Sequence, residues 1–143
     1  MDTLLVVLHV TSNLVWIGTI ASVGWLTAAA SGQADPARGK VVAESAVALY
    51  RRAAVPAFVA SFVFGALRLA VDPAAYMQLH WFHGKLTFAL AVIGLHHVIG
   101  AKAKRTAAGS MQAGKPGAIL VGALLACAFG SVVFAIFKTQ LVR

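Results

Sequence analysis

Acidic residues are scarce in this chain, with four Asp and Glu against twelve Lys and Arg, and charged residues of both signs make up only 11% of it. Ordinary soluble domains carry about 25% charged residues. Hydrophobic residues make up 60% of the 143 residues, and their charge-free runs exceed the length that a bilayer requires. The composition therefore excludes an ordinary soluble domain and predicts an integral membrane protein.

Cysteine is nearly absent too, since Cys127 is the only one. A disulfide within the chain is therefore excluded, and we expect Cys127, which falls within a hydrophobic run, to be a small packing residue. The chain has no Cys-x-x-Cys-His motif, which excludes covalently attached c-type haem. It also lacks a glycine-rich phosphate-binding loop.

Four hydrophobic segments emerge when the charged residues are taken as boundaries. We predict an all-α fold, an integral membrane four-helix bundle that forms one domain over residues 1–143, with helices at about 4–30, 53–71, 81–100 and 118–137. Basic residues collect in the first and third connections: Arg38, Lys40, Arg51, Arg52, Lys102, Lys104, Arg105 and Lys115. By the positive-inside rule these connections are cytoplasmic and both termini lie outside. The net charge of +8 thus reflects topology, and we expect no nucleic acid partner.

Small residues recur at a four-residue spacing on two of the predicted helices. Gly18 and Ser22 lie on the first, and Gly122, Ala126 and Gly130 lie on the fourth. Such faces let helix backbones approach closely in lipid, so we expect a tight bundle. They also allow a homodimer or a place in a larger membrane complex, and the sequence selects neither.

Two histidines fall near the same end of two different predicted helices. His9 lies on the first and His83 on the third, and both of these helices start on the outer side. Two imidazoles at one depth can bind the iron of a haem from its two faces. We therefore predict haem b as the cofactor, with His9 and His83 as the metal ligands.

The helical repeat predicts which side chains accompany these ligands. One stripe on the third helix is expected to face inward: His83, Thr87, Leu90, Gly94 and His97. The matching stripe on the first helix contains His9, Asn13 and Trp16, which makes Trp16 a candidate cofactor contact. His96 points elsewhere, and His96 and His97 lie roughly 20 Å deeper than His83 at 1.5 Å per residue. We expect that pair at the inner membrane boundary and not at the haem.

Three basic side chains lie at the level of the predicted ligands: Arg68, His80 and Lys85. We expect them to bind the haem carboxylates, because a charge within a membrane is costly unless it is paired. Asp72 has the i,i+4 spacing for an ion pair with Arg68. Two alternatives stay open, since the cations can snorkel towards the headgroups and a single intramembrane histidine can hydrogen-bond between helices.

Three segments resemble those of one family in order and spacing. The first is His9-Val-Thr-Ser-Asn-Leu-Val-Trp16, and the second is Leu49-Tyr50-Arg51-Arg52-Ala-Ala-Val-Pro56-Ala with Phe64-Gly65. The third is Trp81-Phe82-His83-Gly84-Lys85-Leu86 with Leu95-His96-His97. Over residues 5–105 the chain resembles the HemJ-type protoporphyrinogen oxidases, small membrane haem proteins related to the CopD group.

The resemblance implies a four-helix haem b protein of the bacterial inner membrane, with His9 and Lys85 at the family's functional positions. In that family protoporphyrinogen loses six electrons and six protons, and the electrons pass to quinone or the respiratory chain. A porphyrinogen substrate and quinone are the partners that the resemblance implies. His9 and Lys85 would be the catalytic residues, with Lys85 or a nearby histidine accepting protons.

The chain departs from the family near the fourth helix. The family has an Asn-Glu-x-Pro segment there, whereas this chain has Met111-Gln-Ala-Gly-Lys115-Pro116 without the acid. Two functions therefore compete: a HemJ-like oxidoreductase, which we prefer, and a non-enzymatic electron-transfer or accessory subunit of a larger membrane complex. Copper handling of CopD type predicts clusters of Met and His, whereas the three methionines, Met1, Met77 and Met111, are scattered.

Overall fold

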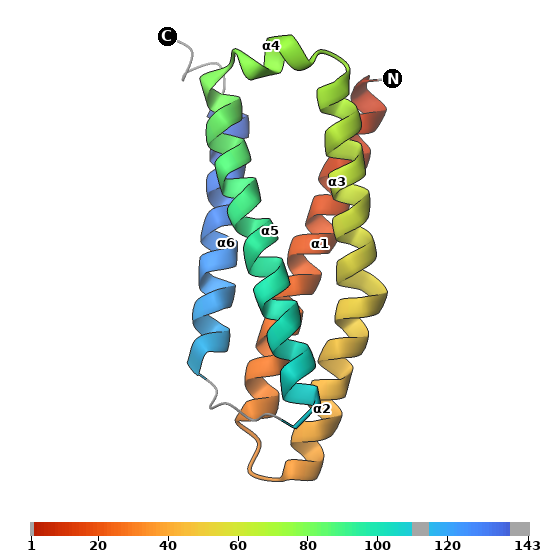
Figure 1. Cartoon of the computed structure of the whole chain (residues 1–143), viewed down its shortest axis with the longest axis vertical. Coiled ribbons are helices and arrows are strands. Elements are labelled where there is room, and N and C mark those ends of the chain that lie inside the picture. The colour runs from red at the N-terminus through yellow and green to blue at the C-terminus, as the bar shows by residue number, and fades with distance from the viewer. Residues whose placement is uncertain (1, 110–114, 138–143) are drawn as a thin grey trace.

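Helices make up every element of the computed structural model of this chain, which describes residues 2–109 and 115–137. In chain order these are α1 (Asp2–Ser31), α2 (Pro36–Leu49), the π-helical segment η1 (Tyr50–Ala54), α3 (Val55–Ala70), α4 (Pro73–Met77), α5 (His80–Ala107) and α6 (Lys115–Ile136). α2, η1 and α3 follow one another without a break and form one long rod (Figure 1). Within the described residues, four helical stretches are long and apolar enough to cross a membrane, which confirms the prediction of an all-helical protein with four such segments.

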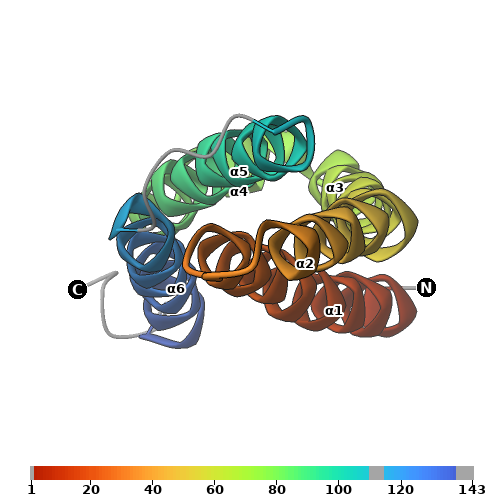
Figure 2. The ribbon, with the colours of Figure 1, turned by 90° about the horizontal axis from the view of Figure 1, so that it is seen from below.

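The helices form two pairs that converge at one end of the bundle. α1 lies beside α3, and α5 lies beside α6, whereas at the end of α2 the helices α1, α2 and α5 come together (Figure 1). Seen end-on, α1 lies between α6 and the α2–α3 rod (Figure 2). Towards α4 the two pairs separate, and both α1 and α5 start at that end. His9 and His83 therefore lie towards the same end of the bundle.

The second membrane helix begins at Pro36, so our prediction of a start near residue 53 was wrong. The Asp35 carboxylate accepts a hydrogen bond from the Ala37 N–H at 2.9 Å, and Pro36 occupies the first turn, both of which favour a helix start. Arg38, Lys40 and the Arg51–Arg52 pair consequently lie on a helix and not in a loop. Charged residues end a stretch that lipid can surround, but they do not end a helix.

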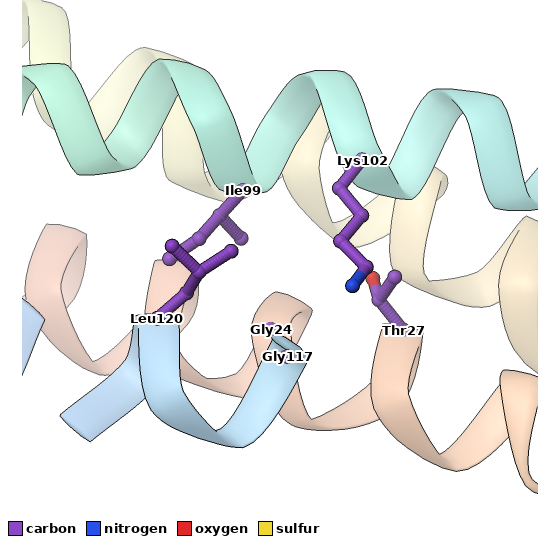
Figure 3. A pocket seen from close by; sticks show the side chains of 6 residues that line it. All are labelled: Gly24, Thr27, Ile99, Lys102, Gly117 and Leu120. Carbon is purple, nitrogen blue, oxygen red and sulfur yellow. The ribbon is translucent and has the colours of Figure 1, made fainter. Parts of the chain in front are cut away.

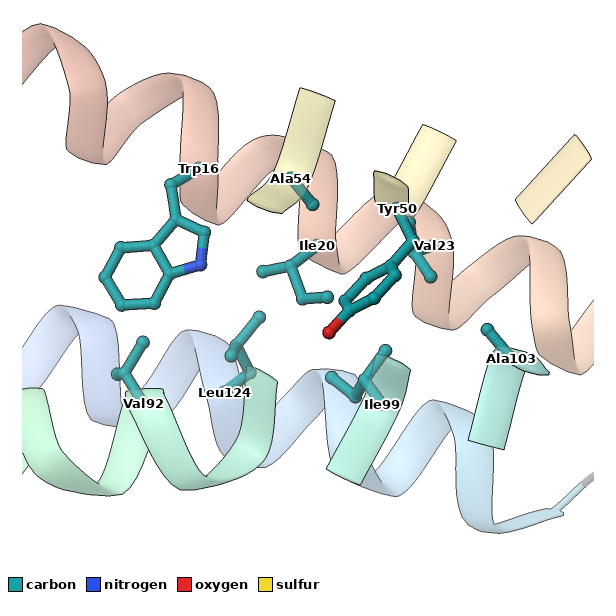
Figure 4. Close-up of a cluster of buried hydrophobic side chains, with 9 residues drawn as sticks. All are labelled: Trp16, Ile20, Val23, Tyr50, Ala54, Val92, Ile99, Ala103 and Leu124. Atoms are coloured by element: carbon teal, nitrogen blue, oxygen red, sulfur yellow. The ribbon is translucent and has the colours of Figure 1, made fainter. Parts of the chain in front are cut away.

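The π-helical segment lies where the rod meets α5. Pro56 lacks a backbone N–H, and the N–H of Val55 bonds to the carbonyl of Tyr50, which widens this turn by one residue. The Tyr50 ring is buried against Gly100 of α5, where any β-carbon would collide with the ring. The buried core surrounds this contact (Figure 4) and contains Trp16, Ile20, Val23, Tyr50, Ala54, Val92, Ile99, Ala103 and Leu124.

The small-residue faces are placed differently from our expectation. Gly130 packs against the ring of Phe88, as a close helix contact requires. Gly18 and Ser22 on α1, and Gly122 on α6, are exposed, so their close packing within the bundle was predicted wrongly. The four-residue spacing identifies a flat helix face, but it does not say which neighbour that face meets.

Candidate functional site

His9 is held in a closed hydrogen-bond network between α1 and α3. Its Nδ1 lies 2.9 Å from the backbone carbonyl oxygen of Ser61, and its Nε2 lies 3.1 Å from the amide nitrogen of Asn13. A carbonyl can only accept, so Nδ1 carries the proton and Nε2 accepts from Asn13. The Ser61 hydroxyl donates to the Asn13 amide oxygen at 2.9 Å, which closes the network. The inward stripe of His9, Asn13 and Trp16 on α1 agrees with the prediction.

Gly65 makes room for the His9 ring. It lies one helical turn beyond Ser61 on α3, and a β-carbon at this position would come within 2.8 Å of the His9 Cε1 atom. The Ser61 carbonyl and the bare backbone of Gly65 together fix the orientation of the imidazole. A metal-bound histidine typically donates its second ring N–H to a carbonyl or carboxylate in this way. The tautomer and the orientation of His9 therefore suit metal binding through Nε2, provided that Asn13 releases that nitrogen.

Lys85 lies in the second turn of α5, at the end of the bundle where α1 also starts (Figure 1). Its charge acts on the His9 imidazole, and the side chain is half-buried. The two residues that the family resemblance singled out thus lie towards one end of the bundle, although 76 positions separate Lys85 from His9 in the sequence. Trp16 is not part of this group, because it lies two turns further along α1 and is buried in the core.

His83 and His80 have a different environment. The His83 side chain is exposed, and its Nε2 lies 2.9 Å from the backbone carbonyl of Met77, to which it donates. His80 is exposed at the start of α5. No hydrogen bond or ring contact joins His83 to His9 within the described residues. The two predicted ligands share one end of the bundle, but the described contacts do not bring them together.

The predicted ion pair between Arg68 and Asp72 is absent, so that prediction was wrong. The Arg68 guanidinium lies over the ring of Tyr76, 5.5 Å from its centroid. The Asp72 carboxylate accepts a hydrogen bond from the N–H of Ala75 at 3.0 Å and caps α4. The i,i+4 rule requires both residues on one helix, whereas α3 ends at Ala70 and Asp72 has left the helical conformation.

The predicted inward stripe of α5 was also wrong. His83, Thr87, Leu90, Gly94 and His97 are exposed. The side of α5 that is buried carries Val92, His96, Ile99 and Ala103. The 3.6-residue repeat shows which residues share a face, but α5 has apolar residues on all sides, so the repeat did not show which face meets the neighbouring helices.

His96 is the residue whose environment sequence analysis missed, since it is 1% exposed and lies in the protein core. The indole N–H of Trp16 donates to its Nδ1 at 3.0 Å, and the ring of Phe58 stacks on it with centroids 4.9 Å apart. The Tyr50 ring lies 5.3 Å away. An indole can only donate, so the proton of neutral His96 is on Nε2. His96 is therefore placed to link α1, η1 and α5 and does not present a lone pair at Nε2.

A metal ion that is held only by side chains needs several ligands from the protein, unlike the iron of a haem. In the described part of the chain, no three His, Cys, Asp or Glu side chains are grouped as they would be around a metal ion. A haem differs, because its porphyrin supplies four nitrogens and the protein supplies only the axial ligands.

Comparison with protein-family models, with curated protein sequences and with solved structures gave no significant match. The relation to HemJ-type proteins thus depends on the three short segments described above. The stretch in which the chain departs from that family includes residues 111–114, which lie outside the described residues, as do Met1, Lys138 and Arg143.

Proposed function

We propose that this chain is a multi-pass protein of the bacterial inner membrane that binds haem b through His9 and takes part in an oxidoreductase reaction. The observation that supports this most directly is the hydrogen bond from His9 Nδ1–H to the Ser61 carbonyl. It fixes the ring and the tautomer, so that the lone pair is on Nε2, as in a histidine that binds a metal. Asn13, which donates to this nitrogen, would have to release it when haem binds. Four membrane-spanning helices supply the low-polarity surroundings in which haem b is usually held.

The neighbouring residues fit such a cofactor in part. Lys85 near the start of α5 and Arg68 near the end of α3 lie towards the same end of the bundle as His9, so each offers a cation to a haem carboxylate. We propose His83 as the second ligand, for which its ring must leave the Met77 carbonyl. A bound haem b would supply one-electron transfer. For the topology, we propose that both termini lie outside and that the basic end of the bundle is cytoplasmic.

Two functions are compatible with such a site. In the first, the protein is a HemJ-like protoporphyrinogen oxidase, with a porphyrinogen substrate and with quinone or the respiratory chain as electron acceptor. The electrostatic effect of Lys85 on His9 favours it, because a half-buried amine at the same end of the bundle is suited to accept protons from a substrate bound there. In the second, the protein is an electron-transfer or accessory subunit. The sequence Lys115-Pro116, which stands where the family has an acid, favours that alternative.

An absorption spectrum tests the haem proposal. We expect the purified full-length protein to show a Soret band and, on reduction with dithionite, the sharp α band of a six-coordinate b-type haem. A pyridine haemochrome assay then measures haem per chain. Protein that purifies folded but colourless, even after incubation with haemin, would show that the proposal is wrong.

Replacement of Lys85 by methionine tests the oxidase function. We expect wild-type protein to restore growth of a strain that lacks protoporphyrinogen oxidase, and Lys85→Met to keep its haem but to lose roughly 100-fold or more of the oxidation rate, as for a lost proton acceptor. Lys102→Met is the matched control, because Lys102 is also half-buried on α5 but lies at the other end. Unchanged oxidation in Lys85→Met would exclude the proton-transfer role, and failure of the wild type to restore growth would favour an accessory subunit.

A further inference from the structure

Four cations lie where α5 meets the π-helical segment: Arg51, Arg52, Lys102 and Lys104. We call them the basic collar. The Lys104 ammonium lies 5.2 Å from the centroid of the Tyr50 ring, the same ring that Gly100 contacts. Arg51 and Arg52 directly follow Tyr50 in η1. The contact between Tyr50 and the Gly100–Lys104 turn thus puts both pairs of cations at one level of the bundle.

That level corresponds to the surface of a bilayer. From Arg52 to Ala70 the rod rises about 27 Å, close to the ~30 Å thickness of the hydrocarbon core. The whole helical stretch Pro36–Ala70 has 35 residues, or roughly 52 Å at 1.5 Å per residue, so α2 must project beyond the hydrocarbon. The basic collar therefore lies among the lipid headgroups when α3 occupies the membrane.

Three side chains of the basic collar are available to an outside anion, and the fourth, Lys102, points into the bundle. Arg51, Arg52 and Lys104 are exposed. Lys102 is half-buried and lies along a narrow crevice between α1, α5 and α6, with its amine pointing towards Thr27 (Figure 3). None of the four has an ion-pair partner within the described residues, and the ion pair of Arg38 with Asp35 lies at the far end of α2.

We propose that the basic collar binds the phosphate headgroup of an anionic phospholipid. Cations between transmembrane helices at headgroup depth are suited to a lipid phosphate, which can accept several charge-assisted hydrogen bonds at once. The acyl chains of the same lipid would lie along the exposed apolar surface of α3, which includes Val59, Phe62 and Val63. The proposal is independent of haem binding, since the basic collar lies at the end of the bundle away from His9.

Native mass spectrometry of the full-length protein tests this proposal. Phosphatidylglycerol and phosphatidylcholine with identical acyl chains are added separately to the purified protein, and the bound lipid is counted. We expect the wild type to prefer phosphatidylglycerol. Each lost charge should weaken its binding by roughly fivefold, so Arg51→Gln with Arg52→Gln should weaken it by about 25-fold. Replacement of both arginines by lysine should keep most of the preference, and circular dichroism checks that each variant is folded.

The matched control is Arg38→Gln with Lys40→Gln, which removes the same net charge farther along the same rod. We expect it to retain the preference for phosphatidylglycerol. Equal loss in both double variants would show that net charge alone matters and would overturn the site, as would a wild type without any preference. Displacement of the lipid by inorganic phosphate would assign the cations to a free anion and would overturn the lipid proposal.

Discussion

Replacing His9 by alanine is expected to abolish haem incorporation, with a loss of affinity of more than about 100-fold. The expectation follows from the network around this residue, in which the Ser61 carbonyl holds Nδ1–H and the lone pair of Nε2 accepts only the Asn13 amide, which a metal would displace. No other side chain of this network can replace that nitrogen, because Asn13 of α1 offers an amide and Ser61 of α3 a hydroxyl. The measurement is haem per chain by pyridine haemochrome, after expression with and without added haem precursor.

Two further histidine variants show how specific that loss is. His97→Ala is the control, since His97 is exposed on α5, and it should leave haem content unchanged. His83→Ala should keep haem but convert it from six-coordinate low-spin to five-coordinate high-spin if His83 is the second ligand. A His9→Ala protein with the wild-type spectrum would contradict the proposal for His9. An unchanged low-spin spectrum in His83→Ala would assign the second ligand to another residue.

Replacing Gly65 by valine is expected to weaken haem binding by roughly 10- to 100-fold, although Gly65 itself binds nothing. This is the usual cost of disturbing the residues that orient a metal ligand. A β-carbon at Gly65 would lie 2.8 Å from the His9 Cε1 atom and 3.1 Å from Nδ1, so the ring must turn away from the Ser61 carbonyl. The measurement is a haem titration of the purified apoprotein, with circular dichroism recorded in parallel.

The matched control for this variant is Gly94→Val. Gly94 also lies within a membrane helix, but no heavy atom lies within 4 Å of the β-carbon that a substitution would add. Both variants carry the same intrinsic cost of placing valine in a helix, so their difference isolates the contact with His9. If Gly65→Val binds haem as tightly as Gly94→Val does, the orientation of His9 by α3 has no part in cofactor binding.

The contacts of His96 show how a histidine can be important for the bundle without being a haem ligand. His96 links three helices through its contacts with Trp16, Phe58 and Tyr50. A hydrogen bond between helices within a membrane contributes on the order of 1 kcal/mol, and stacked aromatic rings add to it. The Trp at seven residues after His9, one feature of the family resemblance, is therefore explained here by packing against His96.

The helix composition of the protein follows from the sequence, while several boundaries do not. Four apolar runs separated by charges are enough to predict four membrane helices, because a bilayer leaves no other way to satisfy the backbone hydrogen bonds of a single span. The start of the second helix was misplaced at residue 53, since α2 continues the same rod outside the apolar run. The capping signal Asp35-Pro36 was present in the sequence and marks the true start.

The candidate site, like the helix boundaries, was predicted from the sequence only in part. His9 and Lys85 were chosen from the sequence, and the fold places both towards one end of the bundle (Figure 1). The roles of Ser61 and Gly65 were not predicted, because a backbone carbonyl and an absent side chain become meaningful only when a second helix lies against them. The predicted ion pair between Arg68 and Asp72 was wrong because α3 ends between the two residues, which the spacing in the sequence does not show.

By itself, the sequence determined that this protein is helical, that four of its stretches can cross a membrane and that His9 and His83 lie towards one end. These properties depend on local hydrophobicity and on the rise of a helix, which each segment carries regardless of its neighbours. Only the tertiary structure decided which face of α5 is buried, that His96 belongs to the core and His83 to the surface, and that Ser61 and Gly65 hold His9. The rotation of a helix about its own axis depends on the side chains that it meets, and in a helix with apolar residues on all sides no local pattern fixes it.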